Sequence, residues 1–201
     1  MKTIPLYKDT SVKILAQPED GCFAKVELNH KDVLYRGLRL VENETGETYV
    51  VYPTRNRVKN GQPVMNRYGD QVIDYIFRPS KECGEYYDTL VMNSYLRADG
   101  LKQIPMDDIP FNDKSKVISV CKMSLPMAKG FVGFAEILYR GMEINDIAIL
   151  KSFDNEYHLV FPHYKEPRGD GKLVKKLYIY PQKEELSKIK DMVLDAYFDL
   201  I

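Results

Sequence analysis

The sequence has 201 residues, of which 44% are hydrophobic and 29% charged. This composition is that of a folded globular protein and excludes a disordered or fibrous chain. The 29 basic and 29 acidic residues give a net charge of zero, so any attraction for nucleic acid would have to come from local clusters of charge. No apolar run approaches the roughly 20 residues of a membrane helix, and the N-terminus lacks the features of a signal peptide. The three cysteines form no CxxC pair, and we expect a cytoplasmic protein with reduced thiols.

The first half of the chain has the pattern of several short strands followed by one helix. Turn signals at "PEDG" and "NETGE" separate alternating apolar segments. A polar loop, "TRNRVKNGQPVMNRYGD", precedes one more strand, and a helical pattern starts at Pro79. The expected strands cover residues 11–17, 22–28, 33–42, 48–53 and 72–77.

The second half repeats this order. A polar loop, "HYKEPRGDG", again precedes a last strand, and a helical pattern starts at Pro181. The expected strands cover residues 117–123, 130–138, 143–152, 157–162 and 174–181. The segment between the halves contains prolines, a glycine and several acids, which is typical of a linker. The predicted division is therefore repeat 1 at 1–99, a linker at 100–114 and repeat 2 at 115–201.

Proline spacing gives the register of the repeat. Pro53 and Pro162 each end an apolar strand, and Pro79 and Pro181 each precede a helix. In this register Lys81, Glu82, Val91 and Tyr95 match Lys183, Glu184, Val193 and Tyr197. The two halves should therefore have the same topology.

The string "LYRG" occurs in both halves, at 34–37 and at 138–141. The proline register places Gly37 opposite Asp146, so the two strings are out of register. The first should enter a strand and the second should span a turn. We interpret the shared string as coincidence on top of a true repeat, because strand alternation and proline spacing constrain more residues.

Strands with hairpin-length connections, followed by one helix, indicate an α+β fold: two tandem copies of an antiparallel sheet unit, each closed by a C-terminal helix. Each unit alone would leave a sheet edge and a helix face uncovered. We therefore expect a monomer in which the halves pack as an internal pseudo-dimer across an apolar interface.

Each half resembles the SpoVG family (stage V sporulation protein G, a septation regulator) of small bacterial proteins. The resemblance rests on "AKVELNHKDVLYRGLRLVENETGETYVVYP", the polar Arg/Lys/Gly loop after that proline, the second strand with its proline, and the closing helix ending in tyrosine. It implies a DNA- or RNA-binding regulator, normally a dimer, without enzymatic activity. The tandem arrangement departs from the single-copy members of the family.

Basic residues gather in the polar loop of each half. Each loop region, from its first proline to its second, has five basic and two acidic residues with glycines and tyrosines among them, which suits phosphate neutralisation and base stacking. The resemblance also implies basic residues early in the helix, which the second half supplies and the first largely lacks. The candidate nucleic-acid-binding residues are Arg55, Arg57, Lys59, Arg67, Lys165, Arg168, Lys172, Lys175, Lys176, Lys183 and Lys188.

Catalytic patterns are missing from the sequence. His30, His158 and His163 have no metal-binding spacing, and Cys83 has acidic neighbours that oppose a thiolate. We expect neither an enzyme nor a metal or other cofactor, and no membrane association. Two hypotheses remain: a nucleic-acid-binding regulator that uses both basic loops, and a protein-interaction or scaffold module that kept the fold without nucleic-acid binding.

Overall fold

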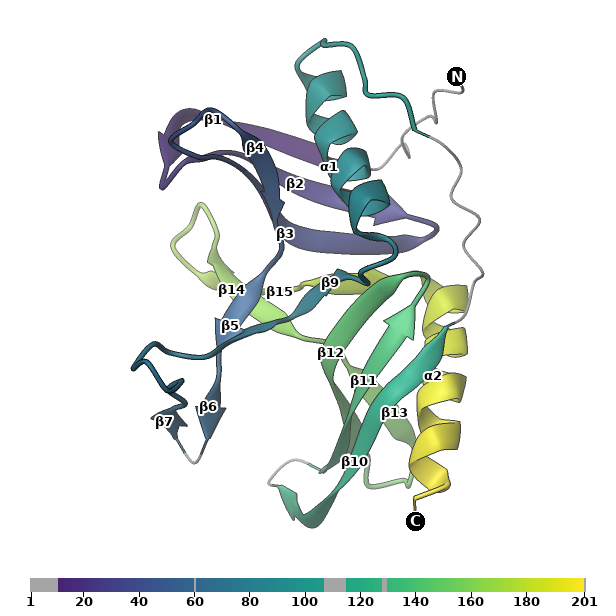
Figure 1. Cartoon of the computed structure of the whole chain (residues 1–201). Coiled ribbons are helices and arrows are strands. Elements are labelled where there is room, and N and C mark those ends of the chain that lie inside the picture. The colour runs from purple at the N-terminus through teal and green to yellow at the C-terminus, as the bar shows by residue number, and fades with distance from the viewer. Residues whose placement is uncertain (1–10, 60, 107–114, 128–129, 201) are drawn as a thin grey trace.

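The computed structural model describes residues 11–59, 61–106, 115–127 and 130–200. The chain forms two five-stranded antiparallel sheets, and one helix packs against each of them (Figure 1). The α+β class and the division into two sheet-and-helix halves are therefore confirmed. One apolar core, formed among the described residues, contains side chains of both halves, so the halves pack as the expected pseudo-dimer.

The first half contains nine strands and one helix among its described residues. They are β1 (Ser11–Glu19), β2 (Cys22–His30), β3 (Val33–Glu42), β4 (Thr48–Val51), β5 (Thr54–Asn56), β6 (Val58–Lys59), β7 (Gln62–Pro63), β8 (Ile73–Tyr75), β9 (Phe77–Pro79) and α1 (Gly84–Ala98). The helix α1 begins at Gly84 rather than near Pro79. Cys83 offers no side-chain cap and glycine is a poor helix former, so turns occupy the residues between.

The second half follows the same order. Its elements are β10 (Lys116–Met127), β11 (Phe131–Tyr139), β12 (Met142–Lys151), β13 (Tyr157–Val160), β14 (His163–Pro167), β15 (Leu173–Leu177), β16 (Ile179–Pro181) and α2 (Lys183–Phe198). The helices bury one face each, which includes Leu90 and Val91 in α1 and Ile189 and Val193 in α2. Each helix packs on the sheet of its own half.

The two halves exchange the short strand that precedes each helix. Strand β16 of the second half pairs with β3 of the first, with Ile179 opposite Tyr35. Strand β9 of the first half pairs with β12 of the second, with Phe77 opposite Ile144. All four of these side chains are buried. The interface between the halves is therefore made of backbone ladders as well as apolar contacts.

The exchanged strands also fix the register of the repeat. Pro181 lies opposite Val33 and Pro79 lies opposite Met142. Counting along β3 and β12 from these pairs makes Gly37 equivalent to Asp146, as the proline spacing predicted. Both residues lie where the strand pairing is irregular, and both have positive φ, at 86° and 59°. This conformation is that of a β-bulge.

The two LYRG strings have the different roles expected of them. In the first half the string lies within β3. In the second half Arg140 and Gly141 form the turn between β11 and β12, both with positive φ, at 50° and 79°. This is the backbone that a two-residue hairpin turn requires. The shared tetrapeptide therefore does not mark the structural repeat.

The polar loops are not loops, and here the sequence-based expectation was wrong. Residues 163–177 form a hairpin, β14–β15. In the first half β5 pairs with β8 and β6 with β7, so residues 54–59 and 61–75 also form a β-arm, called the first arm below. The backbone N–H and C=O groups of a long segment that projects from the sheet need hydrogen-bond partners, and strand pairing within each arm supplies them. Figure 1 shows both arms on the side of the molecule away from the helices.

Part of the predicted linker is ordered against α1. The side chain of Asn93 accepts a hydrogen bond from the backbone N–H of Ile104 and donates one to its carbonyl, at 2.6 and 2.9 Å. Met106 is buried in the core. Residues 107–114, the rest of the expected linker, lie outside the described residues.

Candidate nucleic-acid interface

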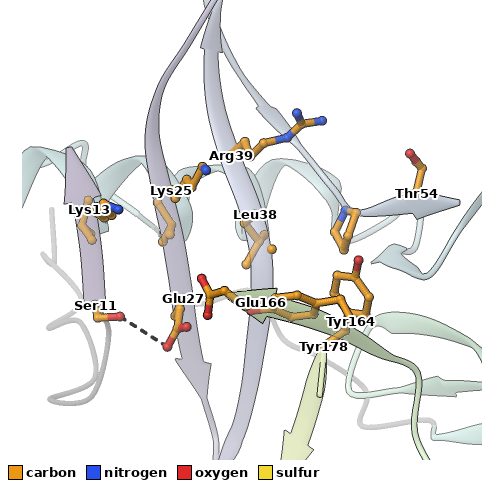
Figure 2. A pocket seen from close by; sticks show the side chains of 14 residues that line it. Ser11, Lys13, Lys25, Glu27, Leu38, Arg39, Thr54, Tyr164, Glu166 and Tyr178 are labelled. Atoms are coloured by element: carbon orange, nitrogen blue, oxygen red, sulfur yellow. Dashed lines mark hydrogen bonds between the residues drawn. The ribbon is translucent and has the colours of Figure 1, made fainter. Parts of the chain in front are cut away.

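A groove of about 540 Å³ separates the hairpin β14–β15 from the first sheet. Its floor is the face of β1, β2 and β3 that α1 leaves uncovered, and its wall is formed by Tyr164 and Glu166 of the hairpin together with Tyr178. Figure 2 shows these three side chains lying across the strands. The second half of the chain thus builds one wall of a groove whose floor belongs to the first half.

Three cationic side chains form a row across the floor of the groove. Lys13 lies opposite Lys25 in the β1–β2 ladder, and Lys25 lies opposite Arg39 in the β2–β3 ladder. All three are exposed (Figure 2). Like charges at directly opposed positions of a sheet are destabilising, so this row does not contribute to the stability of the fold. Its arrangement suits the binding of an anion.

The two carboxylates in the groove are paired with cations outside the row. Glu27 lies 3.4 Å from the guanidinium of Arg36, and Glu166 lies 2.5 Å from the ammonium of Lys176. The hydrogen bond from Lys176, with the nearby positive charges of Lys13 and Lys25, lowers the pKa of Glu166. Within the described part of the chain the row itself makes no ion pair. The groove therefore keeps a surplus of positive charge.

Two tyrosines line the groove beside the row. The ring centroids of Tyr164 and Tyr178 are 4.7 Å apart. Burial raises the pKa of both hydroxyls, so both rings stay neutral at physiological pH. Gly37 permits the position of Tyr178, because a Cβ atom at residue 37 would lie 3.0 Å from a carbon of that ring. Aromatic faces next to cations are the elements that bind unpaired bases and their phosphates.

Two of the four basic residues predicted in the first arm are held by acidic partners. Arg55 lies 2.5 Å from Asp146 of the other half. The single Nε–H of Arg57 is shared between the two carboxylate oxygens of Asp74, at 2.8 and 3.1 Å, and Nη2 of Arg57 also donates to Asp74. This contact lowers the pKa of Asp74. Arg67 lies over the ring of Tyr68, and Lys59 is exposed at the end of β6. The first arm therefore presents less free positive charge than its sequence suggests.

The hairpin keeps more of its predicted positive charge. Lys165 and Lys175 lie directly opposite each other, and both are exposed. Arg168 and Lys172 are joined by a backbone hydrogen bond at the hairpin turn. Lys176, by contrast, belongs to the ion pair with Glu166. Four of the five predicted basic residues of this arm are therefore exposed without an ion pair among the described residues.

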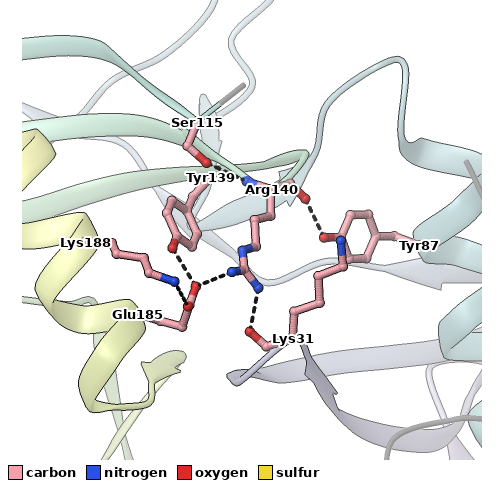
Figure 3. Close-up of polar contacts among 7 residues, drawn as sticks. All are labelled: Lys31, Tyr87, Ser115, Tyr139, Arg140, Glu185 and Lys188. Carbon is pink, nitrogen blue, oxygen red and sulfur yellow. Dashed lines mark hydrogen bonds and ion pairs between the residues drawn. The ribbon is translucent and has the colours of Figure 1, made fainter. Parts of the chain in front are cut away.

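The predicted helix residues lie away from the groove. Lys183 is exposed at the first position of α2. Lys188 donates a 2.7 Å hydrogen bond to Glu185, which is buried and also accepts bonds from Tyr139, at 2.6 Å, and Arg140, at 2.8 Å (Figure 3). Burial alone would raise the pKa of Glu185, but these donors hold it below its usual value. Lys188 is thus part of a structural cluster.

Sequence reasoning did not identify Lys13, Lys25 or Arg39. The sequence signal that could have found them is alternation along the predicted strands, which places each of them on the outward face of the sheet. Their alignment depends on the irregular pairing between Ile14 and Glu19 of β1, and an irregularity of this kind cannot be placed from alternation alone.

Comparisons with protein-family models, curated proteins and solved structures give no match for this chain. Among the described residues, neither helix is long and apolar enough to cross a membrane. The same residues contain no group of three or more His, Cys, Asp or Glu side chains that could hold a metal ion.

Proposed function

We propose that this chain is a nucleic-acid-binding regulatory protein of the SpoVG type, and that it binds through the hairpin β14–β15 and the groove beneath it. The observation that carries the proposal is the row of Lys13, Lys25 and Arg39, which makes no ion pair within the described chain and lies beside a hairpin that has four further exposed cations. Cations held close together without carboxylate partners attract a polyanion, and release of its counterions drives binding.

Binding of this type is electrostatic and depends on salt. The affinity for RNA or DNA should fall steeply as the salt concentration rises, and it should vary little with base sequence. The test is fluorescence anisotropy with labelled oligonucleotides over a range of salt concentrations. A wild-type chain that binds neither RNA nor DNA at about 50 mM salt would overturn the proposal.

The hairpin variant Lys165→Gln/Arg168→Gln/Lys172→Gln/Lys175→Gln tests the outer cations. It should weaken binding to all sequences alike and lower the salt slope. Because Arg55 and Arg57 are already held by Asp146 and Asp74, the variant Arg55→Gln/Arg57→Gln should weaken binding less. The reverse order of effects would move the interface to the first arm.

A second candidate function is a protein-interaction or scaffold module. The first arm favours it, because Val58, Met65 and Ile73 are each more than half exposed, at 57%, 53% and 59%. Apolar side chains gathered on one exposed arm suit a protein partner better than a polyanion. Under this candidate the variant Val58→Ser/Met65→Ser/Ile73→Ser would lose function in the cell, whereas the hairpin variant would keep it.

A further inference from the structure

The groove has a counterpart in the other half, and the two differ in chemistry. The counterpart lies beside the first arm, where the second sheet contributes Phe131, Phe134 and Ala148 to its lining. The equivalence of Gly37 with Asp146 makes Phe134 the equivalent of Lys25 and Ala148 the equivalent of Arg39.

The third position of the row has also lost its charge. Cys121 lies opposite Phe134 in the β10–β11 ladder, as Lys13 lies opposite Lys25 in the first sheet. The cationic row of one half is thus an uncharged row in the other. The Arg55–Asp146 ion pair neutralises the remaining charges that line this second groove. Of these two grooves, the one lined by Lys13, Lys25 and Arg39 has the surplus of positive charge among its described lining residues.

We infer that the cationic groove binds one single strand of nucleic acid per chain, with consecutive phosphates on Lys13, Lys25 and Arg39 and a base against Tyr164. This inference rests on the proposed function. It specifies the ligand as a single strand, the binding site as the groove, and the stoichiometry as one strand per chain. Neighbouring strands lie about 4.8 Å apart, so the Cα atoms of the row span about 10 Å. The long side chains of Lys13, Lys25 and Arg39 let their charges spread beyond this span, toward the wider spacing of consecutive phosphates in an extended strand.

The tyrosine wall selects a single strand over a duplex. A duplex keeps its bases stacked on one another, whereas a single strand offers free base faces to an aromatic ring. Tyr164 and Tyr178 lie beside the cations on the same groove, so one strand can meet both kinds of contact. A duplex would gain only the phosphate contacts.

Tryptophan fluorescence can test the position, because the chain contains no tryptophan. In Tyr164→Trp the introduced indole should be quenched by a single-stranded oligouridine of about 10 nucleotides, and quenching should saturate at one strand per chain. In the matched variant Phe134→Trp, which places the indole in the other groove, the same oligonucleotide should cause little quenching. Equal quenching in both variants, or two strands per chain, would overturn the inference.

The salt dependence tests the role of the row. Each cation bound to a single strand contributes about 0.7 to the slope of log affinity against log salt, so Lys13→Gln/Lys25→Gln/Arg39→Gln should lower the slope by about 2. The control variant Lys102→Gln/Lys116→Gln/Lys122→Gln removes the same charge from exposed positions outside the groove and should change the slope little. Circular dichroism of each variant checks that the fold is kept.

The outcomes separate this inference from the proposed function. A wild-type chain that binds no nucleic acid overturns both. If the wild-type chain binds nucleic acid but the groove and control variants change the salt slope equally, the proposed function stands and the inference is overturned. Equal affinity for a duplex of the same length would also overturn it. The inference is supported if the groove variant loses binding that the control variant keeps, and if the chain binds the single strand more tightly than the duplex.

Discussion

The guanidinium of Arg140 donates a hydrogen bond to the backbone carbonyl of Lys31 at 2.9 Å. The two residues are equivalent, because each is the first residue of the turn that precedes β12 or β3, and each has positive φ. The two corresponding turns of the repeat therefore meet where the halves join. The same guanidinium is held by Glu185 of α2, so the contact connects both halves with the second helix.

Loss of the Glu185 carboxylate should destabilise the whole chain. Glu185→Ala leaves Arg140, whose side chain is 17% exposed, without its anionic partner, and it also removes the acceptor of the Tyr139 hydroxyl. Removing one partner of a buried ion pair costs about 3 kcal/mol. Urea denaturation should show this loss in a single transition. Glu184→Ala, at the neighbouring exposed position of α2, should change stability by less than about 0.5 kcal/mol; equal losses would contradict the account.

The strand exchange predicts that neither half folds by itself as a monomer. Fragments 1–106 and 107–201 each lack the strand that completes their sheet, since β16 pairs with β3 and β9 pairs with β12. Each fragment alone should give poorly dispersed NMR spectra or self-associate. Mixing them should restore the dispersed spectrum of the intact chain. A well-dispersed monomeric spectrum from either fragment alone would contradict the exchange.

The exchange also predicts the oligomeric state. Because each half already receives the strand it needs from the same chain, no second chain is required to complete either sheet, and the high effective concentration of linked halves favours internal pairing. Light scattering should give the 23.3 kDa of one chain. A stable species of twice that mass would indicate exchange between chains.

The proline pattern could predict the repeat but not the exchange. Pro79 and Pro181 each mark the end of a strand before a helix. This signal is the same whether that strand pairs with a strand of its own half or with a strand of the other half. The β-arms were missed for a different reason: "TRNRVKNGQPVMNRYGD" is polar and lacks the alternation of a half-buried strand. The pairing of β5 with β8 and of β14 with β15 comes from backbone hydrogen bonds rather than from burial.

His30 should make stability depend on pH. It is buried, and desolvation together with the charges of Lys31 and Arg140 lowers its pKa from 6.5 to about 4. Between these values the unfolded chain binds a proton that the folded chain does not, so stability is full above about pH 6.5 and falls as the pH falls toward 4. This contribution changes by about 2 kcal/mol between pH 7 and pH 5.

The variant His30→Gln isolates that contribution. Its stability should fall less than that of the wild type between pH 7 and pH 5, by about 2 kcal/mol, when both are measured by urea denaturation. Carboxylates titrate alike in the two proteins, so they cancel in the comparison. Identical pH profiles would show that His30 is not the titrating group.

The basic residues of the hairpin could be predicted from the sequence, whereas the cationic row could not. Lys165, Arg168, Lys172 and Lys175 were found because they are close together in the sequence. Lys13, Lys25 and Arg39 come from three separate strands, and their alignment is produced by the pairing of β1, β2 and β3.

Photocrosslinking of bound nucleic acid tests the central claim most directly. A single-stranded oligonucleotide containing 5-bromouridine, irradiated in complex with the intact chain and mapped by mass spectrometry, should attach mainly to the peptides that carry Tyr164 and Tyr178. The Lys13→Gln/Lys25→Gln/Arg39→Gln variant should lose these adducts at the same oligonucleotide concentration. Adducts confined to the first arm or to α2, or adducts unchanged in this variant, would contradict the assignment of the groove as the nucleic-acid interface.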